Sequence, residues 1–273
     1  MRPHRPAATT LVAVVALLAL AGCSSSGSDA AGTTAPTTAA PKTTTTAPQT
    51  YAEAVSLRLA DELGDPAQAT AVVAGLAPDT LKALETKVPM AEVATSAVLR
   101  YRPERAPDDS VDSVVVFSFG NRVAADGTTT AGPTNEALAD ATAAFVADHP
   151  VPVYAQWEVA HILADRGVAG VTSIEPKVAA DGATTYLSTA GVAEQAVADA
   201  SAAGKPLGTV GVVCFADHAV RCASTATQAG MHAVVPEGVH LPTAYDAQSG
   251  QAWTRDRTAY ITTDLTSRAL EAT

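Results

Sequence analysis

Basic residues are scarce in this sequence, and that scarcity argues against a nucleic acid partner. Lys and Arg number 17 against 28 Asp and Glu, and the net charge is −11 at pH 7. Proteins that bind nucleic acids neutralise phosphates with clustered Lys and Arg. No such cluster is visible along the chain, and we therefore expect no nucleic acid among its partners.

The sequence also lacks the short motifs that mark several common enzyme classes. It contains no GxSxG, no GxxxxGK[ST] and no GxGxxG after its first strand-like run. These absences disfavour nucleophile-elbow hydrolases, P-loop proteins and dinucleotide-binding Rossmann enzymes. Glu158 stands in a WExxH stretch, which lacks the second histidine of the zinc-protease motif. We expect neither a metal nor a cofactor.

Long apolar runs are missing except for one at the amino terminus, from Leu11 to Ala21. It is shorter than the roughly 20 residues that a membrane-spanning helix needs. Arginines precede it and Leu20-Ala21-Gly22-Cys23 ends it, an order that resembles the lipobox of bacterial lipoproteins. The resemblance implies a signal peptide over residues 1–22 and a lipid on Cys23, which would hold the protein on the extracytoplasmic face of the cell membrane. The alternative is an ordinary secretory signal followed by a cysteine that occurs there by chance.

Residues 23–50 are rich in Thr, Ala and Pro and carry few charges. Such a composition cannot bury a core and is typical of a disordered segment. We interpret it as a tether that gives the folded part reach from the membrane surface. The abundance of alanine and threonine with little lysine suggests an actinobacterial source.

Cysteine is rare, and only Cys214 and Cys222 remain beside Cys23. In an oxidising compartment the two could form a disulfide across the strand and helix that carry them. The alternative is a pair of buried free thiols that pack as small apolar groups. Their spacing lacks the close pairing of zinc ligands.

Residues 51–105 are predicted to form a helical segment that packs on the core of the following domain. Prolines near the first turn and apolar residues at helical spacing support this prediction. The helices expected here cover residues 51–64, 66–76, 78–87 and 90–99.

Residues 106–273 are predicted to form an α/β domain, a Rossmann-like three-layer sandwich with a mostly parallel sheet. Apolar runs alternate with amphipathic helical stretches, the pattern of a sheet with helices on both faces. The expected strands cover residues 111–119, 151–155, 171–174, 210–215 and 233–235. Helices are expected over residues 134–149, 157–165 and 188–203, and a closing helix within 251–272.

The stretch from Gly208 to Gly230 combines a buried strand, a tight loop and a helix. Asp217 is predicted to cap this helix, with His218 in the loop and Arg221 one turn further on. Ligands of open α/β sheets bind at the carboxyl ends of strands, next to helix amino ends. These three residues are therefore candidate ligand groups, although each could equally serve an ordinary structural role.

Other polar residues follow the remaining strands in the same way. Gly120 and Asn121 come after the first strand, Glu158 after the second, and Thr184 and Thr185 after the third. Because the carboxyl ends of parallel strands share one edge, these residues are expected to gather there.

Four stretches follow the expected strands in order: VVVFSFGN, VYAQWE, IEP with ATTYLST, and CFADHAVRCASTATQAG, in which His218 and Arg221 form an HxxR pattern. Through these stretches the segment from residue 111 to 235 resembles the YdcF-like family of bacterial envelope proteins. The resemblance implies that Gly120, Glu158, Thr185, His218 and Arg221 fall on the ligand groups of the family. The chain departs from the family at Ala155-Gln156-Trp157, where a glycine-rich turn is usual.

Two functions follow as hypotheses. In the first, a lipid-anchored envelope protein binds, and in its catalytic form hydrolyses, a phosphorylated or sugar-containing envelope precursor. His218 would be the acid–base group, Glu158 the base and Arg221 the clamp for an anion. In the second, the same fold is a non-catalytic envelope-associated binding module.

Overall fold

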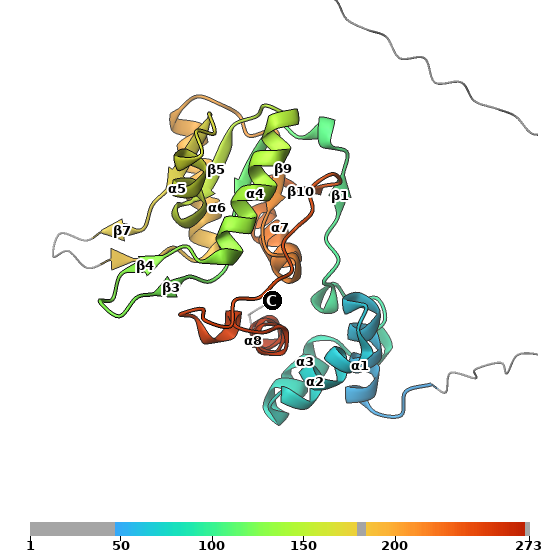
Figure 1. Ribbon diagram of the computed structural model, residues 1–273. Coiled ribbons are helices and arrows are strands. Elements are labelled where there is room, and N and C mark those ends of the chain that lie inside the picture. Colours follow the sequence, from blue (N-terminus) through green and yellow to red (C-terminus); the bar gives the residue numbers. More distant parts are fainter. Residues whose placement is uncertain (1–46, 179–183, 271–273) are drawn as a thin grey trace, which may run out of the picture. The chain divides into compact units, whose positions relative to one another are not determined.

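A sheet of six parallel strands forms the centre of the protein in the computed structural model, which describes residues 47–178 and 184–270 (Figure 1). The order across this sheet is β1-β10-β9-β2-β5-β6, and each neighbouring pair is parallel. The predicted α/β class with a mostly parallel sheet is therefore confirmed. The strands are β1 (Arg105–Ala106), β2 (Ser113–Val116), β5 (Val153–Gln156), β6 (Val171–Ile174), β9 (Thr209–Val213) and β10 (His232–Pro236).

The order in which the strands are added to the sheet reverses at β2. From β2 the chain continues outward through β5 and β6, and it then returns to form β9 and β10 on the other side of β2. Val114 of β2 is level with Val153 of β5 on one side and with Gly211 of β9 on the other. The helices that leave β2 and β9 cover opposite faces, and a crevice opens at the carboxyl ends of these two strands.

Two helices cover each face of the sheet, and the alternation of strand residues separates the two cores. In β2, Val114 and Val116 pack with Leu138 of α4 and Leu163 of α5, whereas Val115 packs with residues of α6 and α7. The helices are α4 (Pro133–Asp148) and α5 (Trp157–Asp165) on one face, and α6 (Thr189–Ala202) and α7 (Ala219–Gln228) on the other. All four were expected from the apolar spacing, with ends that differ by a few residues.

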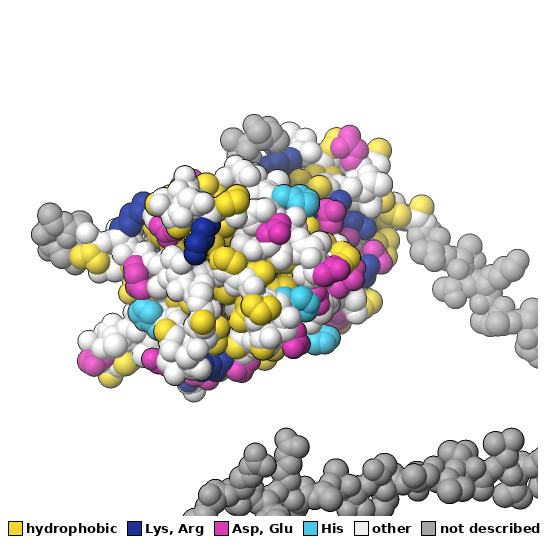
Figure 2. Space-filling view, turned by 90° about the horizontal axis from the view of Figure 1, so that it is seen from above, with side chains coloured by type: hydrophobic (Ala, Val, Ile, Leu, Met, Phe, Trp, Pro, Cys, Tyr) yellow, Lys and Arg dark blue, Asp and Glu magenta, His cyan; other side chains and the backbone are white. Residues whose placement is uncertain are grey.

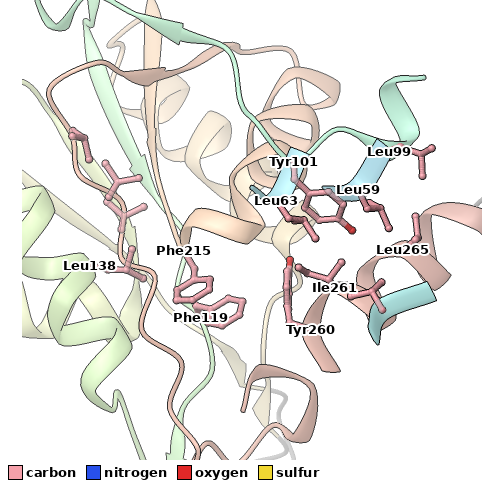
Figure 3. Close-up of a cluster of buried hydrophobic side chains, with 14 of the residues drawn as sticks. Leu59, Leu63, Leu99, Tyr101, Phe119, Leu138, Phe215, Tyr260, Ile261 and Leu265 are labelled. Atoms are coloured by element: carbon pink, nitrogen blue, oxygen red, sulfur yellow. The ribbon is translucent and has the colours of Figure 1, made fainter. Parts of the chain in front are cut away.

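The closing helix α8 (Arg257–Leu270) packs against the amino-terminal helices, although it is the last element of the chain. Its buried Ile261 and Leu265 lie beside Leu59 and Leu63 of α1 (Figure 3). The guanidinium of Arg268 lies 4.5 Å from the centre of the Tyr101 ring. The amino-terminal helices are α1 (Tyr51–Leu63), α2 (Pro66–Gly75) and α3 (Pro78–Lys87).

The helix expected over residues 90–99 is wrong. This stretch forms two short 3₁₀ turns, η1 (Met90–Glu92) and η2 (Ala97–Leu99). The Ser96 hydroxyl accepts a hydrogen bond from the Val98 amide, at 3.2 Å. Side chains of this kind offer the backbone an alternative to helix, and the apolar spacing alone does not reveal that competition.

Two small hairpins lie where only loops were expected. The first joins β3 (Arg122–Val123) to β4 (Thr129–Thr130), and the second joins β7 (Lys177–Val178) to β8 (Thr184–Thr185). Both follow strands of the main sheet at the edge where the crevice opens.

The predicted signal peptide (residues 1–22), Cys23 and residues 24–46 of the predicted tether lie outside the described residues. Within the described residues, none of the helices combines the length and the apolar character needed to cross a membrane. At the start of this part, Thr50 and Glu53 form a reciprocal capping box that begins α1.

Replacing Leu265 by Ala tests whether α8 is part of the core. Leu265 is fully buried, whereas Leu57 of α1 is 51 % exposed. We expect Leu265→Ala to lower the free energy of unfolding by about 2–5 kcal/mol, because it removes buried methyl groups and leaves a cavity. The matched surface variant Leu57→Ala is expected to change it by less than about 0.5 kcal/mol. Urea unfolding of both variants measures this, and equal effects would contradict the packing of α8.

Candidate functional site

A cleft of about 890 Å³ opens at the carboxyl ends of β2 and β9. Its inner wall includes Ser118, Phe119 and Gly120 from the loop after β2, together with Glu158 and His218. The first residues of α5 and α6 and the N-cap residue of α7 line the same space. Helix amino ends carry partial positive charge, so this arrangement favours a ligand with an anionic or strongly polarised oxygen.

Glu158 is the most unusual group in the cleft. The residue is 3 % exposed, and its Oε2 atom has no hydrogen-bond partner. Burial raises the pKa of Glu158 to about 7, although a hydrogen bond with the Ser118 side chain opposes this rise. A carboxyl group with this pKa can both take up and release a proton near neutral pH.

His218 is buried and neutral. Burial lowers the pKa of its imidazole to about 4. The Tyr260 hydroxyl lies 2.5 Å from Nδ1, and the Thr189 hydroxyl lies 3.4 Å from Nε2. Burial raises the pKa of Tyr260 well above its usual value, so the phenol keeps its proton and can donate it to Nδ1. When the hydroxyl donates to Nδ1, the ring hydrogen lies on Nε2, the nitrogen that faces Thr189, and His218 can donate a hydrogen bond from there.

The loop after β2 is held by one buried side chain. Asn135 of α4 is fully buried, accepts from the Phe119 amide at 2.8 Å and donates to the carbonyl oxygens of Gly120 and Ala131. Gly120 has φ of 70°, and a Cβ there would come within 2.8 Å of the Ser249 and Thr254 hydroxyls. Only glycine fits this conformation and this space without strain. The predicted residues Gly120 and Asn121 both line the cleft.

Arg221 lines the cleft as predicted, but its guanidinium also contacts a carboxylate. Its Nη1 atom lies 3.1 Å from Oδ1 of Asp264, and Arg268 lies 2.7 Å from Oδ2 of the same residue. Asp264 is 1 % exposed and therefore depends on these cations for compensation. Two guanidinium groups thus share one carboxylate in this part of the cleft.

Asp217 does not lie in the cleft, and its prediction as the cap of the helix is wrong. The helix α7 begins at Ala219, with His218 as N-cap residue, and Asp217 lies in a 3₁₀ turn before it. Its carboxylate pairs with the Arg257 guanidinium at 2.8 Å and accepts from the Tyr245 hydroxyl, also at 2.8 Å. A buried ion pair outweighs a cap in this position, and its partners lie too far along the sequence to be recognised there.

Thr184 and Thr185 are exposed in the β7–β8 hairpin and are not among the cleft residues. In this part of the chain, the hydroxyl-bearing residues that line the cleft come four residues later, at Ser188 and Thr189. The prediction missed this offset because the hairpin carries the threonines away from the edge of the main sheet. Of the eight catalytic and ligand-binding residues predicted, the structure brings together Gly120, Asn121, Glu158, His218 and Arg221.

Cys214 and Cys222 are two free, fully buried thiols in this structure. Burial raises the pKa of Cys222 well above its usual value, and a hydrogen bond with Cys214 adds to this rise. The thiols pack between β9 and α7, on the face of the sheet that α6 also covers.

Sequence reasoning missed Asn135 and Tyr260 as residues of the site. Asn135 stands in a helix where a polar residue looks like surface, and Tyr260 belongs to a helix that is far away in sequence. Within the described residues there is no group of three or more His, Cys, Asp or Glu arranged to hold a metal. On the face shown in Figure 2, Lys and Arg are scattered among Asp and Glu.

Comparison of the chain with protein-family models, with curated proteins and with solved structures finds no match.

The pKa of Glu158 predicts a particular pH dependence of stability. Folding raises the pKa of Glu158 from 4.5 to about 7. The contribution of its protonation to the free energy of unfolding is therefore fully present below about pH 4.5 and is lost as the pH rises through 7. The loss is at most about 3 kcal/mol. Glu158→Gln keeps the shape and removes the charge, so the variant should gain stability relative to the natural protein between pH 5 and pH 8.

Urea unfolding at both pH values measures this difference, and Glu175→Gln serves as the matched control. Glu175 is exposed, and although burial is the largest single effect and raises its pKa, hydrogen bonds with Ser173 and His161 and the charge of His161 together lower it. Its substitution should therefore not reproduce the gain at high pH. Parallel pH profiles for the natural protein and Glu158→Gln would contradict the buried acidic proton.

Proposed function

We propose that this protein is a lipid-anchored cell-envelope protein of the YdcF-like type that binds and hydrolyses a phosphorylated or sugar-containing envelope precursor. The observation that carries the proposal is the buried Glu158 carboxyl, whose Oε2 has no partner and whose pKa is about 7. Buried, unpaired acidic groups in a cleft are typical of acid–base catalysis rather than of folding.

The proposed roles follow from the contacts of each group. Glu158 takes up and releases the proton, because its pKa lies near neutral pH. His218 donates a hydrogen bond from Nε2 to an oxygen of the ligand, a role different from the acid–base role expected from the sequence. Arg221 and the amino ends of α6 and α7 attract the anionic part of the ligand.

The location at the membrane is supported by the sequence of residues 1–23. The order of arginines, apolar run, small residues and cysteine is that of a lipoprotein signal, and the lipid on Cys23 would anchor the protein outside the cytoplasm. The following residues, up to the start of α1 at Tyr51, would give the folded part reach from the membrane surface.

A non-catalytic binding module is the second candidate function. The observation that favours it is the shared pairing of Arg221 and Arg268 with Asp264, which holds part of the charge in the cleft in internal contacts. A module of this kind would bind the same ligand without turnover.

Ligand binding is tested by thermal unfolding of the protein in the presence of nucleoside diphosphates, sugar phosphates and polyprenyl phosphates. A ligand that binds only the folded state adds about 2.7 kcal/mol at a hundredfold excess over its Kd. We expect one of these classes to raise Tm, and His218→Ala to abolish the rise. His161→Ala is the matched control, since His161 is 57 % exposed in its side chain and pairs with Glu175.

A rise in Tm without any turnover would favour the binding module, whereas no rise with any of the three classes would contradict both candidate functions of the cleft.

Replacing Cys23 by Ser tests the anchor. In a bacterial host that processes lipoproteins, the natural protein should incorporate labelled palmitate and sediment with the membranes. Cys23→Ser should lose the label and leave the membrane fraction, because serine has no thiol to form the thioether. Ser24→Ala is the control and should behave as the natural protein. Equal incorporation of palmitate into Cys23→Ser would contradict a lipid on Cys23.

A further inference from the structure

Ser118 presents a hydroxyl group to the inner wall of the cleft, directly after β2. It lies at the carboxyl end of β2, the strand at which the strand order reverses, and ligands of open α/β sheets usually bind at such a point. The side chain is partly buried and lines the same space as Glu158 and His218. It has no role in the hypotheses drawn from the sequence.

The backbone at Ser118 is fixed by side chains of two other elements. The Ser118 amide donates to the Gln156 side chain at 3.1 Å, and the next amide donates to the buried Asn135 at 2.8 Å. The Phe119 ring stacks on Phe215 with 4.1 Å between ring centres. A reacting group held in this way pays little entropy to reach its working position.

Other hydroxyl groups near Ser118 have structural partners. Ser188 accepts from the Gly191 amide as the cap of α6, at 3.2 Å. Thr254 shares a hydrogen bond of 2.7 Å with Ser249. The Ser118 side chain instead shares the cleft with the Glu158 carboxyl, whose Oε2 is unpartnered, and it is close enough to lower the pKa of that carboxyl. A hydroxyl beside a buried carboxylate is the arrangement of an activated nucleophile and its base.

We infer that Ser118 is the nucleophile of an ester hydrolase, with Glu158 as its base and the Nε2–H group of His218 as a donor to the carbonyl oxygen. The inference rests on the proposed function and narrows it, since it names a carboxylic ester as the bond that is broken. A single negative charge then develops on one oxygen, which suits the neutral donor of His218 and the amino end of α6.

The reaction balances with water as the only second reactant. The Ser118 oxygen bonds to the carbonyl carbon while its proton passes to Glu158, and the negative charge moves to the carbonyl oxygen. The carbonyl re-forms, the ester bond to the alcohol breaks, and the alcohol oxygen takes the proton from Glu158. Glu158 then accepts a proton from water, whose oxygen attacks the acyl group on Ser118. When the carbonyl re-forms, the bond to the Ser118 oxygen breaks, and that oxygen takes the proton back from Glu158. The products are the alcohol, the free acid and the restored serine.

An alkyl fluorophosphonate tests this inference without knowledge of the natural substrate, because it forms a stable bond only with an activated serine. We expect the protein to gain the mass of one phosphonyl group, and peptide mapping to place that group on Ser118. Ser118→Ala should abolish the adduct. Glu158→Gln should slow its formation by about 100-fold or more. In the natural protein the rate should rise as the pH passes through 7, since Glu158 acts as a base only when ionised.

Ser173 provides a matched control within the same chain. Its hydroxyl donates to Glu175 at 2.6 Å, but this pair is exposed and lies outside the cleft. Ser173→Ala should label as fast as the natural protein. Absence of an adduct, or an adduct that persists in Ser118→Ala, would overturn the inference.

Thermal unfolding with the phosphorylated ligands keeps the two proposals apart. A rise in Tm for both the natural protein and Ser118→Ala, together with no adduct, would leave ligand binding in the cleft intact and remove only the ester reaction. Aryl acetate hydrolysis supplies a second measure, since Ser118→Ala should reduce it to the uncatalysed rate. Unchanged hydrolysis by this variant would also contradict the role of Ser118.

Discussion

The pairing of β2 with both β5 and β9 is the constraint on which the site depends. On one side β2 pairs with β5, which follows it in the main sheet, and on the other side it pairs with β9, which comes later in the chain. The helices that follow β2 and β9 therefore lie on opposite faces of the sheet. The loop after β2 and the loop after β9 therefore separate, and neither can fill the space between them. Gly120 and His218 reach this space from the two sides, and Glu158 reaches it from the next strand along.

A second constraint fixes the walls of this space. The Tyr260 hydroxyl binds the His218 ring, and the edge of the Tyr260 ring packs against Phe119 with 4.9 Å between ring centres (Figure 3). Tyr260 belongs to α8, whose other face packs against the amino-terminal helices. The helical segment that precedes the sheet is thus connected to the cleft through α8, and Lys87, Ala97 and Val98 of that segment also line the cleft directly. The position of the His218 ring consequently depends on the packing of α8 against helices near the other end of the chain.

Electrostatics divide the ionisable groups of the cleft into two kinds. Asp264 is buried with two guanidinium groups, and Asp217, just outside, is buried with one. Each of these carboxylates has a compensating partner and contributes to the arrangement of α7 and α8. Glu158 is buried and, among the described residues, forms no ion pair, and burial raises its pKa to about 7. The difference in pairing, rather than the degree of burial, separates the structural carboxylates from the candidate catalytic one.

The sequence by itself determined the elements and the class of fold. Periodic apolar spacing placed α5 at Trp157–Asp165 and β6 at Val171–Ile174 with the bounds that the structure has, and the alternation of strands and helices led to a parallel sheet. It also led to Gly120, Glu158 and His218, because the ends of parallel strands meet at one edge whatever the details of the loops. Local patterns suffice for these conclusions, since each depends on neighbours in sequence.

Only the tertiary structure decided what each of these residues does. Asp217 pairs with Arg257, 40 positions away, and so is no helix cap. Thr184 and Thr185 leave the cleft because they pair with β7 in a hairpin. The Nδ1 atom of His218 has its partner in Tyr260, and the pKa of Glu158 follows from burial by several elements at once. Ion pairing and desolvation act through space, and the partners that set them are separated by chain lengths that no local pattern spans.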